Sequence, residues 1–455
     1  MAMTDPNTTS NTTFQTDTNK VSQVATAGLP EAAPFVDDAL RKQGINPDRL
    51  SVLKVGSKYR FGVVPPWLAR LLLGFGLLIL DEGILRSAVE AHPAVMAGLQ
   101  FLSGMIILMA TCEVLVTATE RLAARLHWNH YTAGTVAEIL STIPELVVIA
   151  FIIHVSPSTA FIIALITIYN NALVFSLYSY FLPKDKHGEF VMPVPITKAG
   201  TQILIGGGAM GLILGLVMLT FNSSGQTKTS FNPIDLGFVS FILLSIFVVY
   251  IYKLMTSYAA EEAEVRENLS MSAEDIRQRI DIVYENIRPS NPATIALLFF
   301  VGVVGAFFGG RQVSGFAEFM LSEAQFNPIL TALILAVFAG MSEYVILWQS
   351  HRKREYGIAL ANAFGGITQV MFLVFPYTLV CIAVYQTAIN PVHPELPLEF
   401  SVAHVLLLLF LFPTFYTLSS LLEEDHTLGI LDTVIMSGIF LFLIVLLATH
   451  GGSAT

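Results

Sequence analysis

The chain has 455 residues, of which 54% are hydrophobic and 13% are charged, and its mean hydropathy is +0.66. The chain has too few polar residues to cover the core of a soluble protein of this size. The composition therefore excludes a water-soluble globular protein and predicts a protein that is embedded in lipid. The net charge of −10 provides no basic surface, and no nucleic-acid partner is expected. Cys112 and Cys381 lie inside apolar segments and indicate no disulfide framework.

The chain begins with a polar segment and continues with apolar ones. Residues 1–60 are rich in Thr, Asn, Ser and Asp and have no helical apolar pattern, so we expect a disordered cytoplasmic tail. Each later apolar stretch is near the roughly 20 residues that cross a hydrocarbon core. The eleven stretches are 64–86, 93–119, 131–154, 158–182, 197–221, 232–257, 292–320, 327–350, 356–386, 401–422 and 428–450.

These stretches predict an all-α polytopic membrane protein with about eleven transmembrane helices. The domain order that we expect is an extra N-terminal helix in 61–90, a first five-helix repeat in 91–257 and a second in 292–455. The two repeats are separated by an acidic cytoplasmic connector in 258–291, which is either a solvated linker or a cation sensor.

The placement of basic residues predicts the orientation. Lys and Arg concentrate in alternate connections, including the Arg352-Lys353-Arg354 run, which places the N-terminus in the cytoplasm. The pattern favours no particular membrane and no particular oligomeric state.

Two glutamates lie in the middle of apolar segments, where a carboxylate is costly and marks an ion pathway. Glu145 and Glu343 are each followed 26 residues later by an amide, Asn171 and Gln369. Five predicted helices separate the two copies, so the copies cross the membrane in opposite directions, as inverted repeats do in secondary transporters. A shift of 198 residues also aligns Glu120 with Glu318 and Asn129 with Asn327.

The first copy gathers oxygen atoms around a proline. Pro144 has no N–H, so the carbonyl of Leu140 loses its helical partner and the helix should kink or break. Ser141, Thr142 and Glu145 place two hydroxyls and a carboxylate beside that carbonyl. Hard oxygen ligands of this kind suit Ca²⁺ and Na⁺.

The second copy has no proline. Here Gly340 is predicted to let a neighbouring backbone approach, and Ser342 supplies a hydroxyl next to the glutamate. Farther along, Gly365 and Gly366 should permit a tight helix crossing near Gln369.

Glu138 is a further candidate. It lies seven residues, or about two turns, before Glu145 and therefore on the same helix face. We expect it either to line the cation entry path or relay protons, or to have a capping or helix-pairing role.

These motifs resemble the two alpha repeats of the cation/Ca²⁺ exchanger superfamily over roughly residues 105–385. Ser141 to Glu145 is similar to the first repeat, and SEYVILW through GIALANAFGGITQVMFLVFP is closer to the second repeat of the Ca²⁺/H⁺ antiporter branch. The resemblance implies two inverted five-helix repeats with a cation held by the two glutamates. The chain departs from that branch at Ala339-Gly340-Met341-Ser342, where a Gly-Asn-Ala-Ala type of run is usual, which implies a divergent member.

The sequence therefore predicts a secondary active antiporter that exchanges Ca²⁺ for H⁺ by alternating access. The alternatives are an exchanger driven by Na⁺ and, more remotely, a passive cation channel. No HExxH, GxSxG or phosphate-loop motif is present, so no enzyme is expected. The expected partners are the lipid bilayer and the transported ions, namely Ca²⁺ or Na⁺ with protons as counter-ions, and no permanently bound cofactor is expected.

Overall fold

The chain folds into long helices, and a computed structural model describes them. The described elements belong to one compact unit, residues 48–455. The predicted tail, residues 1–60, lies outside the described residues. The structure describes residues 65–84, 92–126, 130–184, 188–192, 196–223, 231–268, 291–352, 356–396, 398, 401–423 and 426–450.

The first half contains seven α-helices and three short helical turns among its described residues. They are α3 (Pro66–Ile79) with the π turn η2 (Leu80–Ile84), α5 (Pro93–Leu126), α6 (His130–Ser141), α7 (Ile143–Val155), α8 (Pro157–Tyr178) with the 3₁₀ turn η3 (Ser179–Phe181), the π turn η4 (Ile196–Gly200) with α9 (Thr201–Ser223), and α10 (Pro233–Asn268).

The second half, as described, repeats this order. Its helices are α12 (Pro292–Glu318) with the π turn η5 (Phe319–Glu323), α13 (Pro328–Ala339), α14 (Met341–Arg352), α15 (Tyr356–Gln369), η6 (Val370–Val374), α16 (Phe375–Val384), η7 (Tyr385–Ile389), α17 (Val402–Glu423) and α18 (Ile430–His450). Two short strands, β1 (Phe190–Val191) and β2 (Thr427–Leu428), pair antiparallel and join the halves.

Within the described residues, nine helices are long and apolar enough to cross a membrane, which confirms a polytopic all-α protein. The other two predicted spans are helical, but one contains several charged residues and the other is interrupted. The helix formed by α3 and η2 carries Arg70, Asp81 and Glu82, and the segment 327–350 is interrupted at Gly340. In addition, α10 extends to Asn268 and so enters the predicted connector, whose residues 269–290 lie outside the described ranges.

Proline explains where many helices begin. A proline at the first helical position loses no hydrogen bond, because that N–H has no intrahelical partner, and its fixed φ already suits the helix. At α8, α12 and α13 the preceding side chain also caps the helix by accepting a hydrogen bond from a backbone N–H. The helices that begin with proline are α3, α5, α8, α10, α12 and α13.

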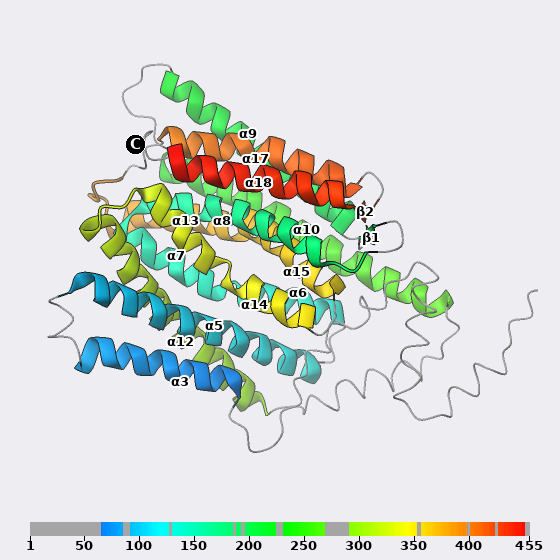
Figure 1. Cartoon of the computed structure of the whole chain (residues 1–455), viewed down its shortest axis with the longest axis horizontal. Coiled ribbons are helices and arrows are strands. Elements are labelled where there is room, and N and C mark those ends of the chain that lie inside the picture. The colour runs from blue at the N-terminus through cyan, green and yellow to red at the C-terminus, as the bar shows by residue number, and fades with distance from the viewer. Residues whose placement is uncertain are drawn as a thin grey trace, which may run out of the picture. The chain divides into compact units, whose positions relative to one another are not determined.

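The main helix pairs take one member from each half. In Figure 1, α5 lies along α12 and α9 lies along α17, and α8 packs against α13, α15 and α18. Glycine makes the α9–α17 contact close: a Cβ added to Gly208 would lie 3.0 Å from Cα of Phe412. The core therefore belongs to both halves together.

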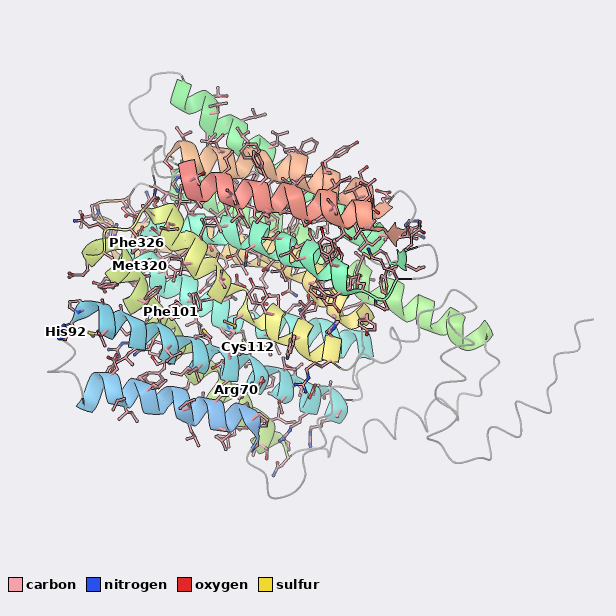
Figure 2. The ribbon with its side chains drawn as sticks, viewed as in Figure 1. Arg70, His92, Phe101, Cys112, Met320 and Phe326 are labelled. Carbon is pink, nitrogen blue, oxygen red and sulfur yellow. The ribbon has the colours of Figure 1, made fainter. Side chains whose placement is uncertain are left out.

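Helix α3, which the sequence predicts as an extra helix, packs against α5, and its Phe75 contacts Phe308 of α12. Leu71 and Leu78 of α3 are buried with Ile107 of α5. Arg70, labelled in Figure 2, forms an ion pair with Glu113, so charge and apolar contact both attach this helix.

The two halves are oppositely oriented at their centres. The chain breaks its helix at Thr142, between α6 and α7, and again at Gly340, between α13 and α14. The difference, 340 − 142 = 198, is the shift that aligns the two glutamates. In Figure 1 the α6–α7 path and the α13–α14 path run in opposite directions, as inverted repeats require.

Candidate functional site

The two helix breaks present the two glutamates in the same way. Glu145 is the third residue of α7, and Glu343 is the third residue of α14. The break predicted at Pro144 is present, with that proline in the first turn of α7. Gly340 provides the second break without a proline. Each carboxylate thus lies in the first turn of a helix, where the helix dipole favours negative charge.

The predicted ligands are buried. Glu145 is 3% exposed and Glu343 is 6% exposed. Among the other candidates Ser141, Thr142, Asn171 and Gln369 are buried and Glu138 is half-buried, whereas the side chain of Ser342 lies outside the part of the chain that is described. Buried polar groups normally have partners, so those without one need an explanation.

Glu145 is such a group. Both of its carboxylate oxygens are buried without a hydrogen-bond partner, and it forms no ion pair within the described residues. Glu343 is close enough to interact electrostatically with both Glu145 and Glu138. Three carboxyl groups therefore share one region of the interior.

Asn171 of α8 lies beside the second break. A Cβ added to Gly340 would lie 2.9 Å from its Oδ1, and one added to Gly366 would lie 3.0 Å from its Nδ2 and 2.8 Å from Cγ of Glu343. Both polar atoms of the Asn171 amide are buried without a hydrogen-bond partner. The close approach that we expected at Gly340 exists, and the atoms nearest to the added Cβ belong to side chains, with the Tyr344 hydroxyl at 2.6 Å. The approach of a neighbouring backbone stays a prediction.

Gln369 of α15 lies beside the first break. The hydroxyl of Thr142 is 3.0 Å from Oε1 of Gln369 and also 3.0 Å from the carbonyl oxygen of Glu138. The Ser141 hydroxyl donates to the same carbonyl at 2.7 Å. Each break therefore meets the amide that belongs to the opposite half.

Glu138 lies against α15. A Cβ on Gly365 would overlap its Oε1, and that oxygen is buried without a hydrogen-bond partner. Tyr250 of α10 lies within electrostatic range of Glu138, and the Thr368 hydroxyl donates to the carbonyl of Gly365 at 3.0 Å. Gly365 and Gly366 thus accommodate carboxylate side chains, and their helix α15 also packs against α8 and α6. The tight helix crossing near Gln369 stays a prediction.

Several contacts were missed by reading the sequence. Asn362 donates to the backbone carbonyl of Glu343 at 3.2 Å, and the amide of Asn170 donates to the Tyr344 hydroxyl. The Cys112 thiol lies 3.9 Å from the carbonyl of Ser141. Each of these residues flanks or faces a break, but their spacing in the sequence carries no signal because the contacts join different helices.

The donor set limits which ion could bind. Within the described residues no group of three His, Cys, Asp or Glu side chains is placed to hold a metal ion. A cation between these helices would need amide, hydroxyl and carbonyl oxygens in addition to carboxylates. Such ligands match Ca²⁺ or Na⁺ and disfavour softer metals.

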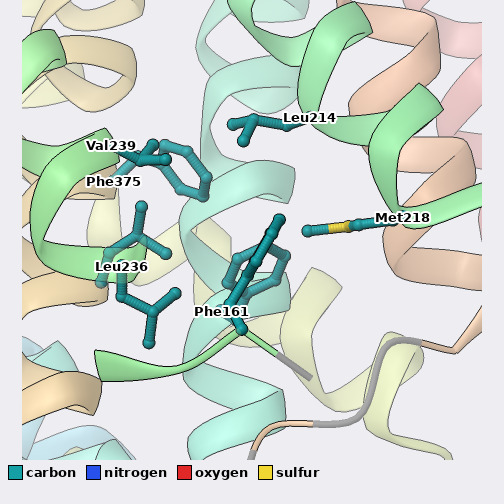
Figure 3. A pocket seen from close by; sticks show the side chains of 8 residues that line it. Phe161, Leu214, Met218, Leu236, Val239 and Phe375 are labelled. Carbon is teal, nitrogen blue, oxygen red and sulfur yellow. The ribbon is translucent and has the colours of Figure 1, made fainter. Parts of the chain in front are cut away.

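The apolar pocket in Figure 3 is a different place. Phe161 and Phe375 form its wall together with residues of α9 and α10, and no polar side chain lines it. It offers no ligand to an ion. The full lining is Phe161, Leu214, Met218, Phe231, Leu236, Val239, Phe375 and Leu379.

Comparison with known proteins gives a family match and a fold match. Residues 290–449 match the sodium/calcium exchanger protein family. No match was found among curated proteins. The structure of native YfkE is similar over 84% of this chain and 98% of that chain, with a TM-score of 0.54 and 11% identity, which shows the fold.

Two further solved structures are similar at lower scores. The H⁺/Ca²⁺ exchanger CAX covers 85% of this chain and 96% of its own, with a TM-score of 0.49 and 13% identity. The sodium-calcium exchanger NCX_Mj covers 77% and 98%, with a TM-score of 0.45 and 16% identity.

Proposed function

We propose that this chain is a secondary active antiporter of the cation/Ca²⁺ exchanger superfamily that exchanges Ca²⁺ for H⁺, which the family match of residues 290–449 and the fold support. As such it would be a membrane transporter of cations and not an enzyme. The residues at the two breaks bear on which ion drives exchange.

The observation that carries the proposal is the state of Glu145. Its two carboxylate oxygens are buried and have no partner, and Glu343 lies within electrostatic range. Two negative charges close together in an apolar interior are unfavourable unless a cation or protons neutralise them. A divalent cation neutralises both charges at once.

Protons fulfil the same role when the cation leaves. No ion pair supplies a positive charge to Glu145 within the described residues, and desolvation favours the neutral form of a carboxyl group. We propose that each glutamate takes up one proton as Ca²⁺ departs and releases it as Ca²⁺ returns. Two protons for one Ca²⁺ would make the exchange electroneutral.

The neutral ligands complete the proposed site. Asn171 offers an amide with no other partner, and Gln369 offers a carbonyl oxygen beside the Thr142 hydroxyl. The Ser141 hydroxyl lies in the same turn, and Ser342 and Glu138 remain proposed contributors. Since the helices on each side of a break can tilt separately, alternating access would carry the glutamates between two openings.

Exchange driven by Na⁺ is the second candidate. The two hydroxyls at the first break, Ser141 and Thr142, favour it, because Na⁺ is bound by hydroxyl and carbonyl oxygens without a need for two carboxylates. A passive channel is the remaining and weaker alternative.

The test is ⁴⁵Ca²⁺ uptake by proteoliposomes under an imposed pH gradient, with the membrane potential clamped by K⁺ and valinomycin. Proton-driven exchange predicts uphill Ca²⁺ uptake that stops when the gradient is collapsed, with no net current. Uptake that needs a Na⁺ gradient would support the second candidate and overturn the first. Movement that only follows the Ca²⁺ gradient would indicate a channel.

A further inference from the structure

A group of polar side chains far from the glutamates joins the two halves at the ends of their helices. It connects the turn between α7 and α8, in the first half, to the segment between η7 and α17, in the second. We name this group the seam. It consists of Ser156, Ser158, Glu395, Ser401 and His404.

Glu395 supplies the central acceptor of the seam. Its Oε2 accepts a hydrogen bond from the Ser156 hydroxyl at 2.9 Å and from the Ser158 backbone N–H at 3.1 Å. Ser156 is also the N-cap of α8, where its hydroxyl oxygen accepts from the Thr159 N–H at 3.0 Å. The carboxylate therefore satisfies one backbone N–H, that of Ser158, at the start of a 22-residue helix.

His404 forms the other contact across the seam. Its Nδ1 must be an acceptor, because the backbone N–H of Ser401 points at it from 3.1 Å and can only donate. The ring proton is then on Nε2, which donates to the Ser158 hydroxyl at 3.1 Å. Ser158 is thus held by the second half through both its backbone and its side chain.

The seam is also connected to the ion site through one short helix. Helix α7 has 13 residues, with Glu145 in its first turn and the extended residue Ser156 directly after its end. Ten residues separate Glu145 from Val155, which is about 15 Å of helix. Because α7 has a non-helical joint at each end, holding one end restricts how far the other can tilt.

The position of the seam is consistent with a cation path that reaches the glutamates from one side of the membrane. With the N-terminus in the cytoplasm, the eleven predicted spans put the 154–158 and 386–401 connections on the same, non-cytoplasmic side of the membrane, and the structure brings them into contact. The strand pair β1–β2 joins two connections that are expected on the other side. When the seam separates, hydrogen bonds from hydroxyls to one carboxylate can be replaced by hydrogen bonds to water. Separating a packed apolar contact would instead expose apolar surface to water.

We propose that the seam is a gate: it closes this end of the cation path in the present conformation and must separate when the exchanger opens to that side. The proposal assigns a role to Glu395 and His404 that is independent of which ion drives exchange. Neither residue needs to touch the cation.

The decisive experiment is a reversible cross-link. Ser156→Cys and Glu395→Cys are combined in a background of Cys112→Ala and Cys381→Ser, and a bifunctional methanethiosulfonate joins them. Ca²⁺/Ca²⁺ exchange in proteoliposomes, which needs no driving ion, should fall to background and recover on reduction. The matched control joins Ser156→Cys to Thr159→Cys within α8, which lie equally close, 2.8 Å between hydroxyl oxygens, but do not cross the seam.

Full exchange by protein that mass spectrometry shows to be completely cross-linked would overturn the gate. A second measurement keeps the test valid even if Ca²⁺ is not the cargo. Thr159→Cys, at a buried position, should react with a membrane-impermeant thiol reagent at a rate that changes with Ca²⁺, Na⁺ or pH. A rate that is constant under all these conditions would contradict the proposal.

A pair of substitutions separates gating from folding. Glu395→Ala removes the acceptor and should raise the labelling rate of Thr159→Cys several-fold. Glu395→Gln keeps one carbonyl oxygen, which can still accept both hydrogen bonds because both go to the same atom. In this variant Thr159→Cys should be labelled nearly as slowly as when Glu395 is present. Equal labelling of the two variants would count against Glu395 as the closing group.

Discussion

The two helix breaks have the same backbone arrangement but different side chains. The difference distinguishes a ligand that is held by another protein group from a ligand that is free to bind an ion. At the first break Thr142 reaches the amide of Gln369. At the second, Gly340 stands where a threonine would be, and the facing amide of Asn171 has no partner. One half of the site is pre-organised by its own hydrogen bond and the other is open.

This asymmetry suggests unequal roles for equivalent residues. A ligand that already has a hydrogen-bond partner in the protein is oriented, but it shares its oxygen with that partner. A buried ligand without a partner contributes more free energy when a cation binds. Among the neutral ligands, we therefore expect substitutions at the second break to lower cation affinity more than their counterparts at the first. The two glutamates carry the negative charge that a divalent cation balances, so we expect both to be essential.

The largest effect is expected at the glutamates. Glu145→Gln and Glu343→Gln should each reduce exchange by about 100-fold or more, because losing a charged buried ligand costs on the order of 3 kcal/mol. The measurement is the initial rate of ⁴⁵Ca²⁺ exchange in proteoliposomes. Since Gln has nearly the same shape, both variants should still elute as folded protein, and unchanged transport by both would refute the site.

A smaller loss is expected from Gly366→Ala. Its Cβ would meet Cγ of Glu343 at 2.8 Å and Nδ2 of Asn171 at 3.0 Å, so both side chains must move. Overpacking of about 1–3 kcal/mol corresponds to roughly tenfold or more in the apparent Kd for Ca²⁺. Gly206→Ala in α9 is the matched control, because nothing lies within 4 Å of its added Cβ, and equal effects would exclude a steric origin.

Asn171→Ala tests the open half directly. Removing a neutral ligand that has no other partner should weaken Ca²⁺ binding by about tenfold, from a loss near 1.5 kcal/mol. Equilibrium binding in detergent is the measurement. Gln369→Ala is the counterpart in the other half, and a larger loss there than at Asn171 would reverse the assignment of the two halves.

The smallest effect is expected at the first break. Thr142→Val keeps the shape but removes the hydroxyl that bonds Gln369, which should weaken binding by about fivefold, from roughly 1 kcal/mol. Thr142→Ser retains the hydroxyl and should restore most of the affinity. If the serine variant binds no better than the valine variant, the hydrogen bond is irrelevant and only the methyl group matters.

The sequence predicted the fold well because its signals are local. Helix-length apolar runs, prolines at helix starts and the 198-residue shift are visible along the chain, and the structure has helices at each predicted span and breaks 198 residues apart. The count of eleven crossings stays a prediction, because α3 carries three charged residues and α13–α14 is interrupted.

The candidate ligands could be selected from the sequence and remain a proposal, whereas the contacts between them could not be predicted. Glu145, Asn171 and Gln369 stand out as polar residues in apolar segments, whereas the asymmetry at Gly340 depends on which side chain from another helix fills the space. The seam could not be predicted for the same reason, because Ser158, the partner of His404, is 246 residues away in the sequence.

The sharing of helix pairs between the halves has a consequence for synthesis. Helix α5 finds its main partner in α12, and α9 finds its own in α17. We therefore expect α5 and α9 to lack these partners in the bilayer until the second half of the chain has been inserted. The protein should therefore fold only after both halves are inserted in the membrane. Chains that are truncated between the halves should be degraded before they fold.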